Sequence, residues 1–365
     1  MNISIDSLAD LSAGAAFLAT GGGGDPYLAY LTTCRALREF GAPRLIAPED
    51  LPDDASVVAI GGVGAPTTSL ELLPSLRDTV CALDGYQEAT GRAVDAVVSF
   101  EIGGGNSMIP IVAAAAKGIA VIDGDGMGRA LPAAQMMTYA IDGIRATPAI
   151  VCDYRGQVTR LDAATTTEYE QLVRRKAMQS GGMVTTVEFW MTGRQLKASV
   201  VPRTVSFSIE IGRLLRGRHG DAQQVAPLLA EAFKHSIYGE FRHLHSGLVT
   251  DVKTATVGGY DVGRATIDSL DAGSALVIDI KNEYLVATKG GIVLASVPDL
   301  ITIVDLETAQ PINAERLRYG QRVSVFAIGC PAYYRTEKAL LAVGPRCFGF
   351  DFDFVPVERR AISGA

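Results

Sequence analysis

Carboxyl side chains follow two consecutive apolar runs near the middle of the sequence. Glu101 comes directly after the run DAVVSF, and Asp123 and Asp125 come after the run IAVI. Carboxyl groups held close together push each other's pKa values apart, so such a set can act as general acid and general base. The same oxygens could instead bind a divalent cation. A third interpretation is structural, because buried acids need a partner and Arg129 lies in the same stretch.

Amide and guanidinium side chains nearby add hydrogen-bonding capacity. Arg129 could pair with Glu101 as a purely structural contact, or it could hold a substrate carboxylate through two parallel hydrogen bonds. Asn106 and Gln135 can both donate and accept, so they suit a ligand with amide-like edges, such as a cyclic imide or ureide. The alternatives are a helix cap for Asn106 and an exposed helix position for Gln135.

Glycine runs lie beside these polar residues. One run of four glycines precedes an Asp-Pro pair that is typical of a helix start, and another run follows the first acid. Backbone N–H groups in such runs can bind an anion or another polar ligand, although a flexible connection between helices is the alternative. The residues considered for ligand binding in these runs are Gly22, Gly23, Gly24, Asp25, Gly104 and Gly105.

Strand and helix patterns indicate how these residues are positioned. Continuous apolar strands alternate with helices up to about residue 160, which is typical of βαβ units in a parallel sheet. A right-handed crossover brings successive strand ends to one edge, so Glu101 and Asp123 are predicted to lie side by side. Beyond residue 247 short strands and turns predict antiparallel β-structure. We therefore expect an α/β domain over 1–163 with a largely parallel sheet, and a mostly β, α+β domain over 164–365.

Composition excludes several classes of function. The 365 residues carry a net charge of −7 with no basic stripe, so nucleic acid is not an expected partner. No apolar run reaches the length needed to span a membrane. Five scattered cysteines and an N-terminus without a basic leader indicate a cytoplasmic protein. The four-glycine run follows a helix rather than a strand, so no nucleotide cofactor is expected, whereas a divalent metal remains one of the alternatives for the carboxylates.

Three long motifs resemble one known family. LATGGGGDPY, FEIGGGNS and DGDGMGRALPAAQM are similar to signature segments of the S-methyl thiohydantoin desulfurase family, and the resemblance continues through KNEYLVA, SVPDLITIVD and GPRCFGFDFDFVPV. The resemblance implies hydrolytic removal of the sulfur substituent from a thiohydantoin ring, with release of a thiol. Family members often occur with hydantoinase- and oxoprolinase-type proteins. The alternative is therefore a non-catalytic ligand-binding or partner subunit of such a system.

The residues suit this chemistry in the following way. The three acids would supply base and acid, and glycine N–H groups would stabilise developing negative charge. Arg129 would hold an anionic substituent, and a metal-bound water is the alternative nucleophile. We expect a small-molecule substrate, with a homo-oligomer and a hydantoinase-type protein as further candidate partners.

Overall fold

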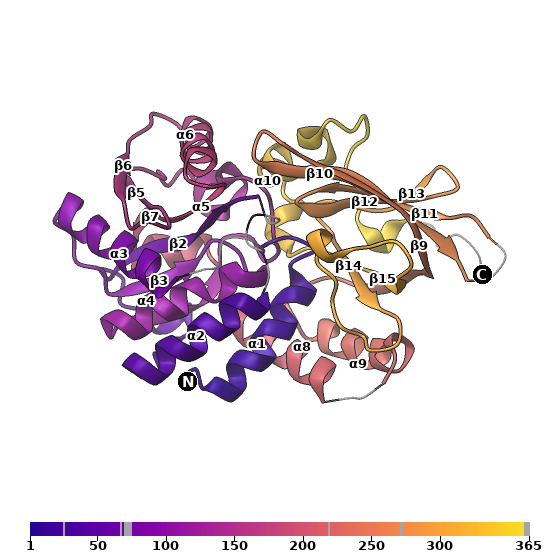
Figure 1. The fold of residues 1–365 in the computed structure, drawn as a ribbon, viewed down its shortest axis with the longest axis horizontal. Helices are drawn as coiled ribbons and strands as arrows, with labels where there is room; N and C mark the ends of the chain where they lie inside the picture. Colours follow the sequence, from indigo (N-terminus) through magenta and orange to yellow (C-terminus); the bar gives the residue numbers. More distant parts are fainter. Residues whose placement is uncertain (25, 66–67, 69–74, 218–219, 271–272, 361–365) are drawn as a thin grey trace.

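Two sheets organise the chain, and helices pack around the first of them (Figure 1). The computed structural model describes residues 1–24, 26–65, 68, 75–217, 220–270 and 273–360. The helices in these ranges are α1 (Ile5–Leu18), α2 (Pro26–Phe40), α3 (Leu76–Thr90), α4 (Ile109–Lys117), α5 (Thr138–Ile141), α6 (Thr166–Gln179), α7 (Gly193–Ser199), α8 (Thr204–Arg216), α9 (Ala222–Lys234) and α10 (Glu337–Val343).

The first sheet has a parallel centre with antiparallel strands beside it. Its order is β1-β4-β3-β2-β7-β5-β6, with β8 pairing to β4. Strands β1, β4, β3 and β2 are parallel, as the βαβ pattern predicts. Its strands are β1 (Leu45–Ile46), β2 (Ser56–Gly64), β3 (Ala96–Ser99), β4 (Ala120–Asp125), β5 (Ala149–Cys152), β6 (Val158–Leu161), β7 (Met183–Thr192) and β8 (Val201–Pro202). Strands β7 and β8 come from after residue 163, so the chain returns to complete this sheet.

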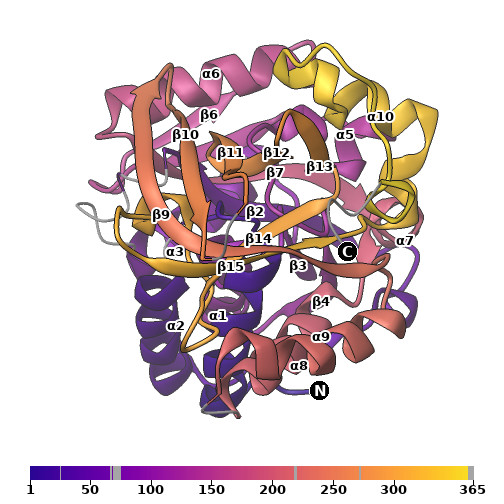
Figure 2. The same cartoon turned by 90° about the vertical axis from the view of Figure 1, so that its right-hand side faces the viewer.

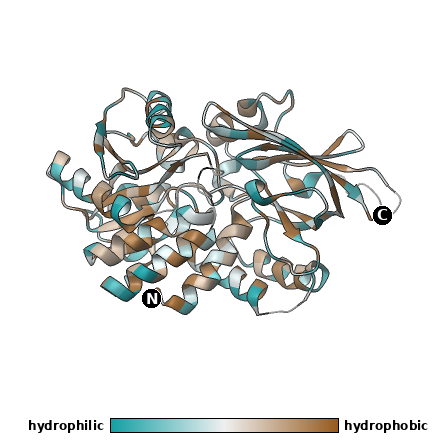
Figure 3. Cartoon of the chain, viewed as in Figure 1, coloured by the Kyte–Doolittle hydropathy of each residue, from teal (hydrophilic) through white to brown (hydrophobic). Residues whose placement is uncertain are grey.

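The second sheet is entirely antiparallel and curves as Figure 2 shows. Its order is β13-β12-β11-β10-β9-β15-β14. Its strands are β9 (Phe241–Val257), β10 (Tyr260–Ser269), β11 (Leu276–Lys281), β12 (Glu283–Lys289), β13 (Ile292–Ser296), β14 (Leu300–Asp305) and β15 (Arg322–Ile328). Buried and half-buried residues alternate along β11, and Figure 3 shows mixed hydropathy along these strands, as expected for a sheet with one buried face. The predicted combination of an α/β part and an antiparallel α+β part is confirmed.

Helix α1 connects the first glycine run to both parts of the fold. A Ser4 capping box starts the helix. A Cβ on Gly14 would lie 1.8 Å from the Ser208 carbonyl oxygen, so glycine is needed where α1 and α8 touch. At the other end, the Thr302 hydroxyl on β14 donates to the Phe17 carbonyl at 2.7 Å. These contacts fix the position at which the glycine run leaves the helix.

Candidate active site

The two glycine runs touch each other through their backbones. The N–H of Gly105 donates to the Gly24 carbonyl and the N–H of Asn106 donates to the Gly23 carbonyl, both at 3.2 Å. Gly23 has φ +74°, and a Cβ there would lie 2.3 Å from the Gly103 carbonyl oxygen. The glycines therefore permit a close approach of two loops. Those N–H groups of the second run are used in that contact, whereas Asp25 lies outside the described residues.

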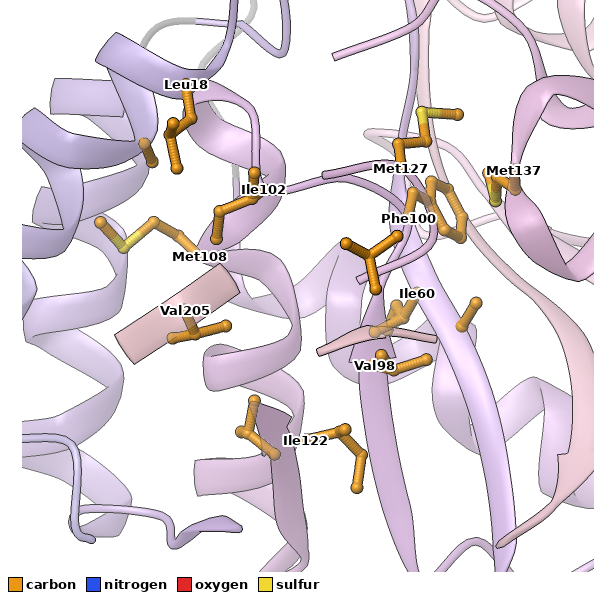
Figure 4. Close-up of a cluster of buried hydrophobic side chains, with 14 of the residues drawn as sticks. Leu18, Ile60, Val98, Phe100, Ile102, Met108, Ile122, Met127, Met137 and Val205 are labelled. Carbon is orange, nitrogen blue, oxygen red and sulfur yellow. The ribbon is translucent and has the colours of Figure 1, made fainter. Parts of the chain in front are cut away.

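A cavity of about 60 Å³ lies beside these loops, which is room for several water molecules. Its walls include Gly23 and Gly24, the end of β2, helix α6, strand β7 and the start of β12. One side is apolar, and Figure 4 shows Phe100 close to Met127 and Met137, which all line the cavity. Its charged lining residues are Glu101, Glu170, Arg174, Glu188 and Glu283. We call this cavity the glutamate pocket.

Glu101 is buried in the wall of the glutamate pocket. Its Oε1 accepts from the Asn106 amide at 2.7 Å, and its Oε2 accepts from the Leu131 N–H at 3.1 Å. Burial raises the pKa of Glu101 to about 7, although these two donors and the nearby guanidinium of Arg129 oppose the shift. A carboxyl group that titrates near neutrality can take up and release a proton under physiological conditions.

Asn106 orients this carboxyl group. The Gly62 N–H donates to its Oδ1 at 2.7 Å, which leaves its amide N–H pointing to Glu101. Asn106 lines the pocket as well, so it joins the end of β2 to the acid. Gln135 is half-buried and lies outside the pocket lining, and its Oε1 has no hydrogen-bond partner in the described part of the chain.

Asp125 accepts hydrogen bonds from backbone N–H groups and does not line the pocket. Strand β4 continues three residues beyond the apolar run, and Asp125 pairs with Ser99 across an irregular register. The Asp125 carboxylate accepts from the N–H of Ile102 and from the N–H of Gly128. Burial raises the pKa of Asp125 to about 8 against these donors. Through these two hydrogen bonds, Asp125 links the loop that follows Glu101 to the loop that contains Gly128.

Asp123 points away from the pocket, which differs from the juxtaposition with Glu101 that the sequence predicts. Its Oδ1 accepts from the Ser206 N–H at 2.9 Å in the first turn of α8. Its carbonyl accepts from the Arg203 N–H at 2.7 Å. Strand β4 packs against α8 at this point, so the Asp123 side chain accepts from the first turn of that helix and caps it.

Replacing Asp123 with Asn tests this placement. Asn keeps an oxygen that accepts the Ser206 N–H, so we expect the free energy of unfolding to change by less than about 1 kcal/mol. Because the side chain does not reach the pocket, any activity should be unchanged. Denaturant unfolding and a rate assay check both expectations. A loss of rate in a stably folded variant would restore a catalytic role for this carboxylate.

Arg129 is fully buried between the two parts of the fold. Its guanidinium donates to the Thr20 hydroxyl at 2.7 Å, to the Asp299 carbonyl at 2.7 Å and to the Pro298 carbonyl at 3.1 Å. It also donates to the carbonyls of Ala130 and Tyr284. The hydrogen bonds of Arg129 thus go to neutral oxygens, and the side chain joins the first glycine run to the second sheet. Its charge still acts on Glu101 from nearby.

Sequence reasoning missed four charged residues of the glutamate pocket. Glu170 and Arg174 form an i,i+4 ion pair at 2.6 Å on α6, which is a recognisable helix pattern. Glu188 is a single acid within the apolar residues of β7, and Glu283 stands inside the motif KNEYLVA. A lone acid in a buried strand is a signal that could have identified Glu188.

Within the described ranges, no three or more His, Cys, Asp or Glu side chains are grouped so that they could hold a metal ion. The helices described there are all too short or too polar to cross a bilayer.

Fold and site together define a two-domain α/β protein with a carboxyl-lined pocket next to paired glycine loops. Two domain families described as S-Me-THD-like match the chain, the N-terminal one over 6–163 and the C-terminal one over 164–357. The chain therefore belongs to the S-methyl thiohydantoin desulfurase-like family. A crystal structure of a protein from Chromobacterium violaceum has the same fold, with a TM-score of 0.82 and 23% identity over 98% of this chain and 100% of that one. No curated protein matches the chain.

Proposed function

We propose that the protein is a hydrolase that cleaves the carbon–sulfur bond of an S-substituted thiohydantoin or a related small cyclic ureide. The observation that carries this proposal is Glu101, a pocket-lining carboxyl group whose pKa lies at about 7. Membership of the S-Me-THD-like family supports the substrate class. The apolar wall around Phe100 and Met127 suits the flat face and sulfur substituent of such a ring.

Glu101 acts first as a general base in the proposed reaction. Its carboxylate takes a proton from a water molecule, and the water oxygen forms a bond to the ring carbon that carries the sulfur. The pair of electrons of the carbon–nitrogen double bond moves to the ring nitrogen, which takes the proton from Glu101. Glu101 then takes the proton of the added hydroxyl group as the carbon–oxygen double bond forms. The carbon–sulfur bond breaks, its electrons leave with sulfur, and Glu101 gives this second proton to the thiolate. One water is consumed, and the products are a thiol and the hydantoin.

Both oxygens of Glu101 already accept one hydrogen bond from the protein. A carboxylate has about four lone-pair positions, so each oxygen keeps capacity for a water molecule or a proton. The Asn106 amide and the Leu131 N–H hold the group in one orientation, which lowers the cost of arranging the reacting atoms.

The decisive experiment is thiol release by the purified chain alone, with S-methyl thiohydantoin as substrate and a thiol-reactive dye as detector. Catalytic release of methanethiol with matching formation of hydantoin supports the proposal. Saturable binding of the ring without thiol release would instead favour a ligand-binding subunit of a hydantoinase-type system. Addition of such a partner would then be needed for turnover.

A further inference from the structure

Glu188 lines the glutamate pocket and has one free carboxyl oxygen. The side chain is fully buried, its Oε2 accepts from the hydroxyls of Tyr169 and Thr186, and its Oε1 has no hydrogen-bond partner within the described residues. Phe189 next to it has φ +48°, and the pairing of β7 with β2 is irregular at this point. A bulge of this kind re-aims side chains, and strained backbone of this kind clusters at functional sites.

Glu283 lines the same pocket from the second sheet and has a second free oxygen. It begins β12, is 2% exposed, and its Oε2 also lacks a partner among the described residues. A Cβ on Gly22 would lie 2.3 Å from Glu283 Oε1, so the glycine run leaves the room that this side chain occupies. A buried polar atom without a partner costs free energy, so two of them in one pocket indicate that a ligand completes them.

Arg174, the cation in the pocket lining, is already engaged. Its Nε donates to Glu170 at 2.6 Å, and its other nitrogens donate to backbone carbonyls, including that of Pro132. Its guanidinium also stacks on the Tyr260 ring with 4.2 Å to the ring centre. A ligand carboxylate in this pocket would therefore lie near acidic side chains, and Arg174 would have no free donor to pair with it.

Burial sets the protonation of the two free groups. It raises the pKa of Glu188 to about 8 and the pKa of Glu283 well above its ordinary value. Both groups are therefore mostly neutral at pH 7, and a neutral carboxyl group can donate one hydrogen bond and accept others. Such groups match a ring edge that carries both N–H and C=O.

We infer that Glu188 and Glu283 determine substrate specificity: their free oxygens hydrogen-bond the polar edge of an uncharged ureide ring, and the pocket rejects rings that carry a carboxylate. This inference rests on the proposed function only in taking the glutamate pocket as the substrate site. The inference predicts that neutral rings of the hydantoin type bind and that anionic rings of the oxoproline type do not. Family membership alone does not distinguish these two classes of ligand.

Calorimetric binding of hydantoin and of hydantoin-5-acetate to the full chain tests the inference without requiring turnover. The two ligands share the ring and differ in one carboxylate. We expect hydantoin to bind at least about tenfold more tightly, since a buried unpaired charge costs more than 1.4 kcal/mol. Equal or tighter binding of the acetate overturns the inference, as does an absence of hydantoin binding.

Four variants assign the effect to the two residues. Glu188→Met and Glu283→Met should each weaken hydantoin binding about tenfold, whereas Glu188→Gln and Glu283→Gln keep polar groups and should retain most of it. Unfolding midpoints identify any variant that fails to fold, and the second residue then carries the test. Wild-type affinity in both Met variants overturns the inference. Mn²⁺ binding to the metal-stripped protein gives a further test. If the wild-type protein binds Mn²⁺ tightly and both Met variants do not, the free oxygens are metal ligands and the inference is overturned. A wild-type protein with the expected binding pattern and no thiol release removes the proposed function and leaves the specificity intact.

Discussion

Replacing Glu101 with Gln is expected to lower the rate of thiol release by about 10²–10⁴-fold, the usual contribution of a general base. Gln has nearly the shape of Glu but cannot take a proton from water. Hydantoin should still bind, because the ring edge is held by Glu188 and Glu283 in our proposal. Initial rates of thiol release and calorimetric binding measure the two effects separately.

Stability must be checked in the same variant. Both Glu101 oxygens accept hydrogen bonds, and Gln has only one acceptor oxygen, so E101Q should lose about 1–2 kcal/mol of unfolding free energy. The Asp123→Asn variant is the matched control, because it changes a neighbouring carboxylate that does not line the pocket. A folded Glu101→Gln protein with a normal rate would contradict the proposed mechanism.

The pH dependence of kcat/KM provides a second measure of Glu101. The base must be ionised, so kcat/KM should rise with pH through the Glu101 ionisation near its pKa of about 7. It should fall again above about pH 8, where Glu188 loses the proton that ring binding requires in our inference. Burial raises the pKa of Glu101, and the positive charges of Arg129 and Arg174 oppose this rise. The Glu283 carboxyl group also interacts with Glu101, which raises the pKa of Glu283. Asp123→Asn should keep the same midpoint.

Replacing Arg129 with Met is expected to lower the free energy of unfolding by at least about 3 kcal/mol, because several buried oxygens would lose their donor at once. These oxygens belong to both parts of the fold, from Thr20 to the carbonyls of Pro298 and Asp299. Denaturant unfolding measures the loss. Arg129→Lys should recover only part of it, since one ammonium group cannot reproduce the planar fork.

An exposed arginine is the matched control for this experiment. Arg213 lies on α8 with its side chain 70% exposed and pairs with Asp10 at 3.4 Å. Arg213→Met should change stability by less than about 1 kcal/mol, as is usual for surface ion pairs. A similar small change in Arg129→Met would mean that Arg129 does not hold the domains together.

Several features followed from local patterns alone. The apolar strands with intervening helices predicted the parallel centre of the first sheet, and the later short strands predicted the antiparallel second sheet. Both predictions rest on periodicity, which short stretches of sequence carry. The same patterns placed Glu101 after a buried strand, and the structure puts it in a pocket wall.

Other features depended on contacts between distant segments. The side-by-side placement of Glu101 and Asp123 assumed that β4 ends with its apolar run, but β4 continues to Asp125 and turns Asp123 toward α8. Arg129 was expected to meet a carboxylate, yet its partners come from residues 20, 284, 298 and 299. No local pattern indicates which carbonyls a buried guanidinium will reach.

The sequence by itself determined the family, the kinds of secondary structure and the presence of acids among glycine loops, since each of these is written in adjacent residues. Only the tertiary structure decided which acids share a pocket. Glu170, Glu188 and Glu283 join Glu101 there because the chain returns after residue 163 to extend the first sheet and because β12 packs against the glycine run. Burial in that pocket then raises the pKa values of Glu101, Glu188 and Glu283, and burial is a property of the folded chain.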